Sequence, residues 1–116
     1  MKNLKVKIIK TRVVGSYFGH SNMRFFGKYA EDGMTFILVK LKLTNQGENI
    51  INIDFDKVFV SDEFGDKFSF HSFYGFSNRK LKLKPGKRVR RNLYFEFPKN
   101  ETPVGLHIDK NKFKIN

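Results

Sequence analysis

The 116-residue sequence contains no cysteine and no tryptophan, and the missing thiols exclude several kinds of chemistry. Without cysteine the chain cannot form a disulfide, use a thiol nucleophile or build a zinc site from thiolates. It also lacks any run of 18 apolar residues, the length that a membrane-spanning helix requires. Acidic residues are scarce, with 11 against 23 lysines and arginines, so the formal charge is +12. A charge of this size favours anionic partners.

Sequence motifs of common catalytic sites are absent as well. The chain has no phosphate-binding glycine loop, no nucleophile elbow and no His-Glu-x-x-His segment. His20, His71 and His107 lie far apart, and none has another histidine two to four residues away, as metal sites commonly do. We therefore expect a protein that is not an enzyme and that holds no metal and no cofactor.

The residues that are plentiful are hydrophobic and aromatic. They make up 40% and 16% of the chain, and 14 of them are phenylalanines. This composition supplies enough apolar surface for one core, and the length suits one domain over residues 1–116.

Strand signals dominate the pattern. In Met34–Thr44 the large aliphatic residues alternate with Lys40, Lys42 and Thr44, which is the period of a half-buried strand. By similar criteria we predict strands at residues 5–14, 50–60, 67–74, 80–84, 89–97 and 104–115, with residues 15–33 as a long connection. The prediction is an all-β fold, an immunoglobulin-like antiparallel β-sandwich of about seven strands.

Cations crowd around a Pro-Gly turn in residues 81–97, LKLKPGKRVRRNLYFEF. Pro85 and Gly86 suit the central positions of a type II turn. The pattern predicts a hairpin whose apolar residues, among them Leu93, Phe95 and Phe97, point inward while the cations point outward; we call this hairpin the basic ribbon. The candidate residues for binding an anion or partner are Lys80, Lys82, Lys84, Lys87, Arg88, Arg90 and Tyr94.

Arg91 does not fit this alternation, because its phase matches that of Val89 and Leu93 and would point it into the core. We predict a β-bulge between Lys87 and Arg91 that resets the phase.

The basic ribbon allows three interpretations. It could contact an acidic protein or an anionic surface polymer. Alternatively, it could bind single-stranded nucleic acid, with cations along the phosphates and Tyr94, Tyr74 or Phe76 stacking on bases. It could also be a solvated surface without a ligand, since outward strand positions must be polar.

A second charged group is acidic and comprises Asp54, Asp56, Asp62, Glu63 and Asp66. Its spacing breaks the calcium-loop pattern of the EF-hand. The sequence favours solvated turn residues here, with a cation held by Asp62, Glu63 and Asp66 as the alternative.

The order of four segments is similar to that in the bacterial DUF4352 family, a telokin-like, immunoglobulin-type β-sandwich related to a secreted mycobacterial antigen. The segments are KVKIIKTRVVGSYFG at the start, MTFILVKLKLTNQG, FDKVFVSDEFGDKF, and LKLKPGKRVRRNLYFEFP with its Pro-Gly turn and Phe-x-Pro ending. The resemblance covers residues 5–108. It implies an exported or lipid-anchored binding protein of the cell envelope, and it supplies no catalytic residues to carry over.

The expected location depends on the start of the chain. In MKNLKVKIIK, lysines interrupt the apolar residues before the hydrophobic region of a signal peptide can form. We expect a cell-envelope or extracellular location if the chain is a trimmed mature fragment. If Met1 is the native start, we expect a cytoplasmic location.

Overall fold

The computed structural model describes residues 3–14, 16–21, 24–29, 33–69, 72–73, 79–108 and 111–115; for residues 14, 16–21, 24–29 and 72–73 it describes the backbone only. The described elements are β1 (Leu4–Val14), β2 (Ser16–Ser21), β3 (Arg24–Tyr29), β4 (Met34–Asn45), β5 (Ile51–Asp54), the 3₁₀-helix η1 (Phe55–Lys57), β6 (Phe59–Asp62), β7 (Lys67–Ser69), β8 (Ser72–Phe73), β9 (Lys80–Leu83), β10 (Arg88–Pro98), β11 (Pro103–Ile108) and β12 (Asn111–Lys114).

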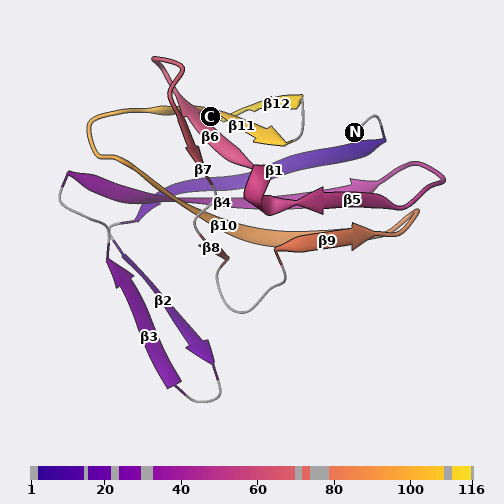
Figure 1. Cartoon of the computed structure of the whole chain (residues 1–116), viewed down its shortest axis with the longest axis horizontal. Helices are drawn as coiled ribbons and strands as arrows, with labels where there is room; N and C mark the ends of the chain where they lie inside the picture. Colours follow the sequence, from indigo (N-terminus) through magenta and orange to yellow (C-terminus); the bar gives the residue numbers. More distant parts are fainter. Residues whose placement is uncertain are drawn as a thin grey trace.

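The strands pair antiparallel in two larger sheets and two smaller ones (Figure 1). The first sheet has the order β1-β4-β10-β8, and the second has the order β12-β11-β6-β7. β5 pairs with β9, and β2 pairs with β3 in a hairpin that extends away from the other strands in Figure 1. In the described part of the chain no helix is long and apolar enough to cross a bilayer. The predicted all-β sandwich is confirmed.

The core lies between the first sheet on one side and the second sheet with the β5–β9 pair on the other. One cluster joins Leu41 and Leu43 of β4, Leu83 of β9, and Val60 and Leu106 of the second sheet. The residues predicted to point inward from β10, Leu93, Phe95 and Phe97, are each 0% exposed, which confirms that part of the pattern. Complete burial of such side chains contributes about 1.5–3 kcal/mol each to the free energy of unfolding.

The predicted strand over residues 50–60 is wrong, because η1 divides it. The Asp54 carboxylate accepts a hydrogen bond from the Asp56 backbone N–H (3.0 Å) and caps η1, while Phe55 is fully buried. The chain thereby leaves β5, which pairs with β9, and enters β6, which pairs with β11.

Other boundaries also differ from the prediction. The predicted connection over residues 15–33 contains the β2–β3 hairpin, and the predicted last strand is the β11–β12 hairpin. β7 and β8, both within the predicted strand 67–74, belong to different sheets. Residues 70, 71 and 74–78, with Tyr74 and Phe76, lie outside the described residues.

The Pro-Gly turn has the predicted conformation but connects two different sheets. Gly86 has a φ of 76°, and the Lys87 N–H donates to the Lys84 carbonyl (3.0 Å), as in a type II turn. However, β9 pairs with β5, whereas β10 pairs with β4. The predicted two-stranded basic ribbon is therefore wrong.

The buried side chain of Asn45 explains how the chain crosses from β9 in one sheet to β10 in another. Its Nδ2 donates to the carbonyls of Leu83 (2.8 Å) and Asn49 (2.7 Å), and its Oδ1 accepts from the Gly47 N–H (2.9 Å). These bonds hold the end of β9 against the end of β4. Leu83 consequently enters the core from the side opposite to the first sheet.

The predicted bulge in β10 is also wrong. β10 pairs with β4 without a register shift from Arg88, opposite Thr44, to Pro98, opposite Met34. Arg91 therefore faces the core side opposite Leu41, where it is half-buried. Its Nη1 donates to the Arg90 carbonyl (2.9 Å), and its buried Nε has no hydrogen-bond partner among the residues that the structure describes. The register shift in this sheet lies in β1, between Ile8 and Lys10.

A candidate anion-binding face on the first sheet

Cations line up across β1, β4 and β10 on the outer face of the first sheet. The pairing places Lys7, Lys42 and Arg90 side by side on neighbouring strands. Corresponding rows place Lys5 and Arg88 on either side of Thr44, Lys10 beside Lys40, and Arg12 beside Leu38. We call this set, Lys5, Lys7, Lys10, Arg12, Lys40, Lys42, Arg88 and Arg90, the basic face.

The basic face follows from the alternation of the strands. Inward residues such as Leu41 are fully buried, so the lysines on either side of Leu41 must point outward. Neighbouring strands lie about 4.8 Å apart, and alternate residues along a strand lie about 7 Å apart. On the outward positions of β4 and β10, the one acidic residue is Glu96, which lies beyond Tyr94, away from the cations.

Lys42 lies at the centre of the basic face and experiences its electrostatic field. Partial desolvation lowers its pKa, and repulsion from Lys7, Arg88, Arg90 and Lys5 lowers it further. A bound anion would offset this repulsion, so the centre of the face favours negative charge.

Two shallow hollows lie beside Lys42. One, of about 310 Å³, is lined by Lys42, Arg88, Val89 and Arg90. The other, of about 220 Å³, is lined by Lys5, Lys7, Lys42, Thr44, Gln46 and Arg88. Both place several cationic side chains around one small volume.

The basic surface continues around the edge formed by β1. A groove of about 560 Å³ there is lined by β1 residues, including Lys7 and Lys10, and by Lys112, Phe113 and Lys114 of β12. A long anionic chain could thus contact both the outer face and this edge.

The structure divides the predicted binding residues between two sides of the sandwich. Arg88 and Arg90 belong to the basic face, and Lys87 is exposed in the turn just before it. Lys80 and Lys82 alternate with leucines of β9 that enter the core from the opposite side. These two lysines and Lys84, which is exposed in the turn after β9, are therefore not part of the basic face.

The prediction that Tyr94 lies exposed beside the cations is wrong. Tyr94 shares their outward phase but is 5% exposed, and it clusters with Phe36 and Leu38. Its ring contacts Phe36 edge to face, with 6.4 Å between ring centroids. A ring buried in this way cannot stack on a nucleic-acid base.

The histidines are not brought together as a described site. His107 on β11 is half-buried, stacks on Phe59 with 4.4 Å between ring centroids, and shares a hydrogen bond with the Ser61 hydroxyl (2.9 Å). Burial lowers the pKa of His107, and the charges of Lys112 and Lys67 lower it further. The His20 side chain and His71 lie outside the described residues.

Sequence reasoning missed the cations that β1 and β4 contribute. Lys5, Lys7, Lys40 and Lys42 all alternate with apolar residues, which was visible in the sequence. The pairing of residues 4–14 with β4, and of β4 with β10, was needed to bring them to one face.

Comparison with solved structures identifies two similar folds. A conserved hypothetical protein from Bacillus anthracis has 18% sequence identity and a TM-score of 0.66, with 100% of this chain and 89% of that chain covered. An uncharacterized β-sandwich protein from Clostridium difficile 630 has 13% identity and a TM-score of 0.64, covering 100% and 87%. At these identities the likeness concerns the fold alone. Comparison with curated proteins finds no match.

Comparison with protein families confirms the resemblance carried by the four segments of the sequence. Residues 1–115 match the model described as a domain of unknown function, DUF4352. The match spans nearly the whole chain, and the protein therefore belongs to the DUF4352 family.

Proposed function

We propose that this protein is a non-enzymatic binding module whose basic face captures an anionic polymer at the bacterial cell envelope. The observation that carries the proposal is the row of Lys7, Lys42 and Arg90 across neighbouring strands, with further cations in the rows on either side. Such a grid suits a partner whose negative charges repeat along its length, because many weak contacts then add together.

A polymer suits the basic face better than a small anion. The hollows beside Lys42, of about 310 and 220 Å³, lie at or below the lower end of the range of about 300–1,000 Å³ that is typical of small-molecule sites. The cationic groove at the β1 edge extends the same surface and would lengthen the contact.

The proposed contact is electrostatic rather than based on stacking. Single-stranded nucleic-acid platforms combine cations with exposed rings. On the described outward positions of β4 and β10, the rings are Phe36 and Tyr94, and both are buried. This favours an anionic polymer without bases, such as a glycerol-phosphate polymer or a polysaccharide that carries sulfates or carboxylates, over a single-stranded nucleic acid.

The cell envelope is proposed as the location because proteins of this family are typically exported or anchored there, where anionic polymers are abundant. Localising the tagged native protein by cell fractionation tests this part separately. Recovery only in the cytosol would contradict it.

The binding test compares two variants that lose equal charge. In the face variant, Lys7, Lys42, Arg88 and Arg90 are changed to serine. In the control variant, Lys57, Lys82, Lys84 and Lys99, which are exposed outside the basic face, are changed to serine. Binding is measured by fluorescence anisotropy with a labelled glycerol-phosphate polymer, heparin and a single-stranded oligonucleotide.

The wild-type protein should bind the glycerol-phosphate polymer, with an affinity that falls about 100-fold between about 50 and 200 mM salt if four ion contacts form. The face variant should lose about the same factor at the lower salt, and the control variant should lose much less. Equal losses would show a general field of charge rather than a site. Preference for the oligonucleotide that persists at the higher salt would favour the nucleic-acid alternative.

A further inference from the structure

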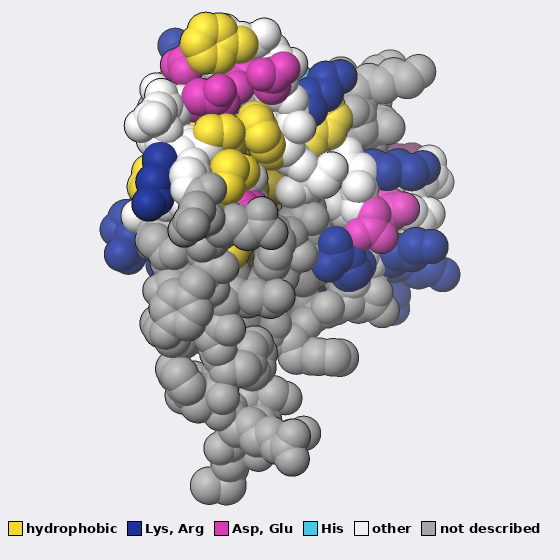
Figure 2. All heavy atoms as spheres, turned by 60° about the vertical axis from the view of Figure 1, so that its left-hand side comes forward, with side chains coloured by type: hydrophobic (Ala, Val, Ile, Leu, Met, Phe, Trp, Pro, Cys, Tyr) yellow, Lys and Arg dark blue, Asp and Glu magenta, His cyan; other side chains and the backbone are white. Residues whose placement is uncertain are grey.

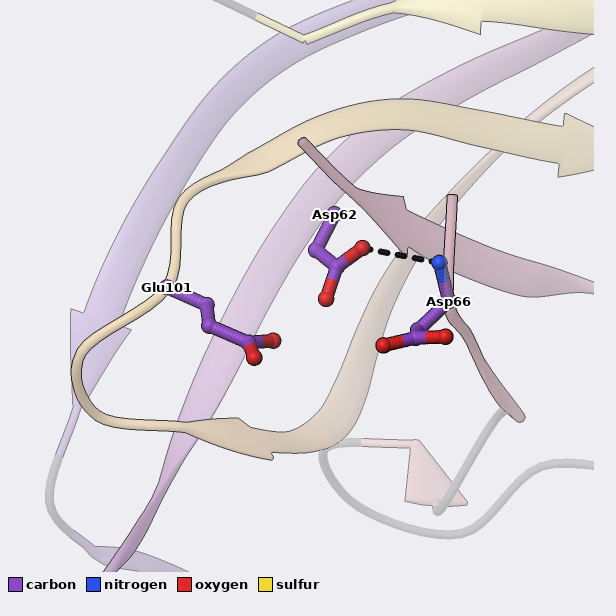
Figure 3. Close-up of side chains that lie close together, drawn as sticks. All are labelled: Asp62, Asp66 and Glu101. Carbon is purple, nitrogen blue, oxygen red and sulfur yellow. Dashed lines mark hydrogen bonds between the residues drawn. The ribbon is translucent and has the colours of Figure 1, made fainter. Parts of the chain in front are cut away.

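Three carboxylates converge where two turns of the sandwich meet. Asp62 ends β6, Asp66 immediately precedes β7, and Glu101 lies in the turn between β10 and β11. Figure 2 shows acidic side chains gathered at the top of the molecule, where Figure 1 places the β6–β7 turn. Figure 3 shows the three carboxylates turned toward one another, and one oxygen of each lies within 4.8 Å of the others. We call these residues the acidic corner.

Asp62 is 2% exposed, and among the described residues only one of its carboxylate oxygens has a hydrogen-bond partner. Oδ1 accepts hydrogen bonds from the backbone N–H groups of Phe64 (3.0 Å) and Asp66 (2.8 Å). Oδ2 is buried and, when Asp62 and Glu101 are both ionised, has no hydrogen-bond partner within the described part of the chain; a proton on Glu101 would supply one. Burying a carboxylate oxygen without a partner is costly, so this atom is suited to a ligand.

Glu101 presents a second oxygen of the same kind. Its Oε2 is buried and has no hydrogen-bond partner among the described residues. Two hydrogen bonds from backbone N–H groups fix its turn: the Glu101 N–H donates to the Pro98 carbonyl (3.3 Å), and the Thr102 N–H donates to the side-chain Oε1 of Glu63 (3.2 Å). The two turns are thus tied together, and Glu101 is held beside Asp62.

The negative charge of the acidic corner is not balanced by a described cationic side chain. None of the lysines and arginines that the structure describes forms an ion pair with Asp62, Asp66 or Glu101. Asp62, Asp66 and Glu63 instead surround Glu101 with further negative charge. The group therefore needs either a proton or a cation to be stable.

We propose that Asp62, Asp66 and Glu101 bind one calcium ion. Carboxylate oxygens are the donors that calcium prefers. Oxygens up to 4.8 Å apart can contact one ion at the calcium–oxygen distance of about 2.4 Å, whereas magnesium requires about 2.1 Å and a near-ideal octahedron. Asp66 is exposed, so water can complete the coordination.

The ion would join the β6–β7 turn to the β10–β11 turn. Three carboxylates without a dedicated loop give a site of modest affinity, with a Kd on the order of 10⁻⁴–10⁻³ M, comparable to extracellular calcium modules. This inference is independent of the basic face, which lies on the outer side of the first sheet.

The test measures thermal unfolding and heat of binding on the full chain, after chelator treatment. In about 10 mM CaCl2, well above the expected Kd, the Tm should rise by about 6–11 °C relative to EDTA. Titration calorimetry with CaCl2 should show one site per chain. The same concentration of MgCl2 should shift the Tm much less.

Two isosteric variants assign the site. Asp62→Asn retains Oδ1 as an acceptor for the turn while replacing the free oxygen, and Glu101→Gln removes a charge from a half-buried position. Both should fold, as judged by circular dichroism, and lose the calcium-dependent shift. Glu48→Gln, an exposed residue of the β4–β5 turn, is the matched control and should retain the shift.

Several outcomes would overturn the proposal. Wild-type protein whose Tm and calorimetric signal do not respond to calcium would leave a shared proton as the explanation of the acidic corner. A full calcium shift in Glu101→Gln would place binding elsewhere, and this variant serves even if Asp62→Asn does not fold. An equal shift with magnesium would contradict the assignment to calcium.

Discussion

Asn45 and Asp62 are both buried polar side chains that organise turns, yet they differ in how far their hydrogen-bonding capacity is used. Asn45 is 0% exposed, and both polar atoms of its side chain have backbone partners. Asp62 is 2% exposed, but its Oδ2 has no hydrogen-bond partner among the described residues. The hydrogen-bonding atoms of the Asn45 side chain therefore all serve the fold, whereas Asp62 stabilises its turn and still has one oxygen that a ligand could contact.

The difference gives a rule for locating function in a fold without catalytic motifs. A buried polar atom that has its partners stabilises the fold and leaves nothing to bind. A buried atom without one is a cost that a ligand can offset. The basic face is a third kind of surface, since its cations are largely exposed and regularly spaced and therefore suit an extended partner.

Replacing Asn45 with alanine should have the largest effect on the stability of the fold. The variant loses the bonds to Leu83, Asn49 and Gly47 and leaves buried backbone groups unpaired, so we expect the free energy of unfolding to fall by about 2–4 kcal/mol. Urea denaturation measures this loss.

The matched control for this change is Asn49→Ala. Asn49 is exposed and contributes its backbone carbonyl to Asn45, so its free energy of unfolding should stay within about 0.5 kcal/mol of the wild type. A similar small loss in Asn45→Ala would mean that the crossing between the sheets does not depend on this amide.

The contrast also shows how much the sequence could predict. Alternation in residues 34–44 and 89–97 predicted β4, β10 and the inward residues Leu93, Phe95 and Phe97 correctly. Alternation says which side of a strand a residue occupies, but it does not say which strand is its neighbour. The basic ribbon was therefore wrong, and the cations of β1 and β4 were missed.

For a similar reason, the sequence predicted only part of the acidic corner. Asp62 and Asp66 lie four residues apart and belong to one turn, so the sequence marked them as a cation alternative. Glu101 lies far along the chain and reaches them through the pairing of β11 with β6. The predicted third ligand, Glu63, instead accepts a hydrogen bond from the Thr102 N–H.

Arg91 is intermediate between Asn45 and Asp62, because within the described part of the chain its buried Nε has no hydrogen-bond partner although its Nη1 has one. Arg91→Met keeps the aliphatic stem and removes that unpaired donor, so we expect a gain of about 1 kcal/mol in the free energy of unfolding. Polyanion affinity should stay unchanged, because Arg91 faces the core side. Urea denaturation and anisotropy measure the two quantities.

Arg90→Met is the control for this prediction, since it removes the same charge from the adjacent residue. It should weaken polyanion binding and alter the free energy of unfolding by less than about 0.5 kcal/mol. If both variants weaken binding equally, the proposed separation between outward and inward cations fails.

The smallest effect concerns the pH dependence of stability at the acidic corner, where Glu101 is only half-buried and Asp66 is exposed, so that water screens part of the charge. The folded-state pKa of Glu101 is raised to about 7 from an ordinary value of 4.5, chiefly by its hydrogen bond with Asp62. The folded chain therefore holds this proton more tightly than the unfolded chain. The stability that Glu101 contributes is fully present below pH 4.5 and is lost as the pH rises through about 7.

Urea denaturation in EDTA at about pH 5 and pH 8, which lie on either side of this transition, isolates the contribution when the wild type is compared with Glu101→Gln. The wild type should lose more stability between the two pH values than the variant, because glutamine does not titrate. The deficit of Asn45→Ala should be nearly the same at both values, since an amide carries no titratable proton. Equal pH dependence of the wild type and Glu101→Gln would mean that the two carboxylates do not contact each other, and Asp62 would then resemble Asn45 in having a structural role alone.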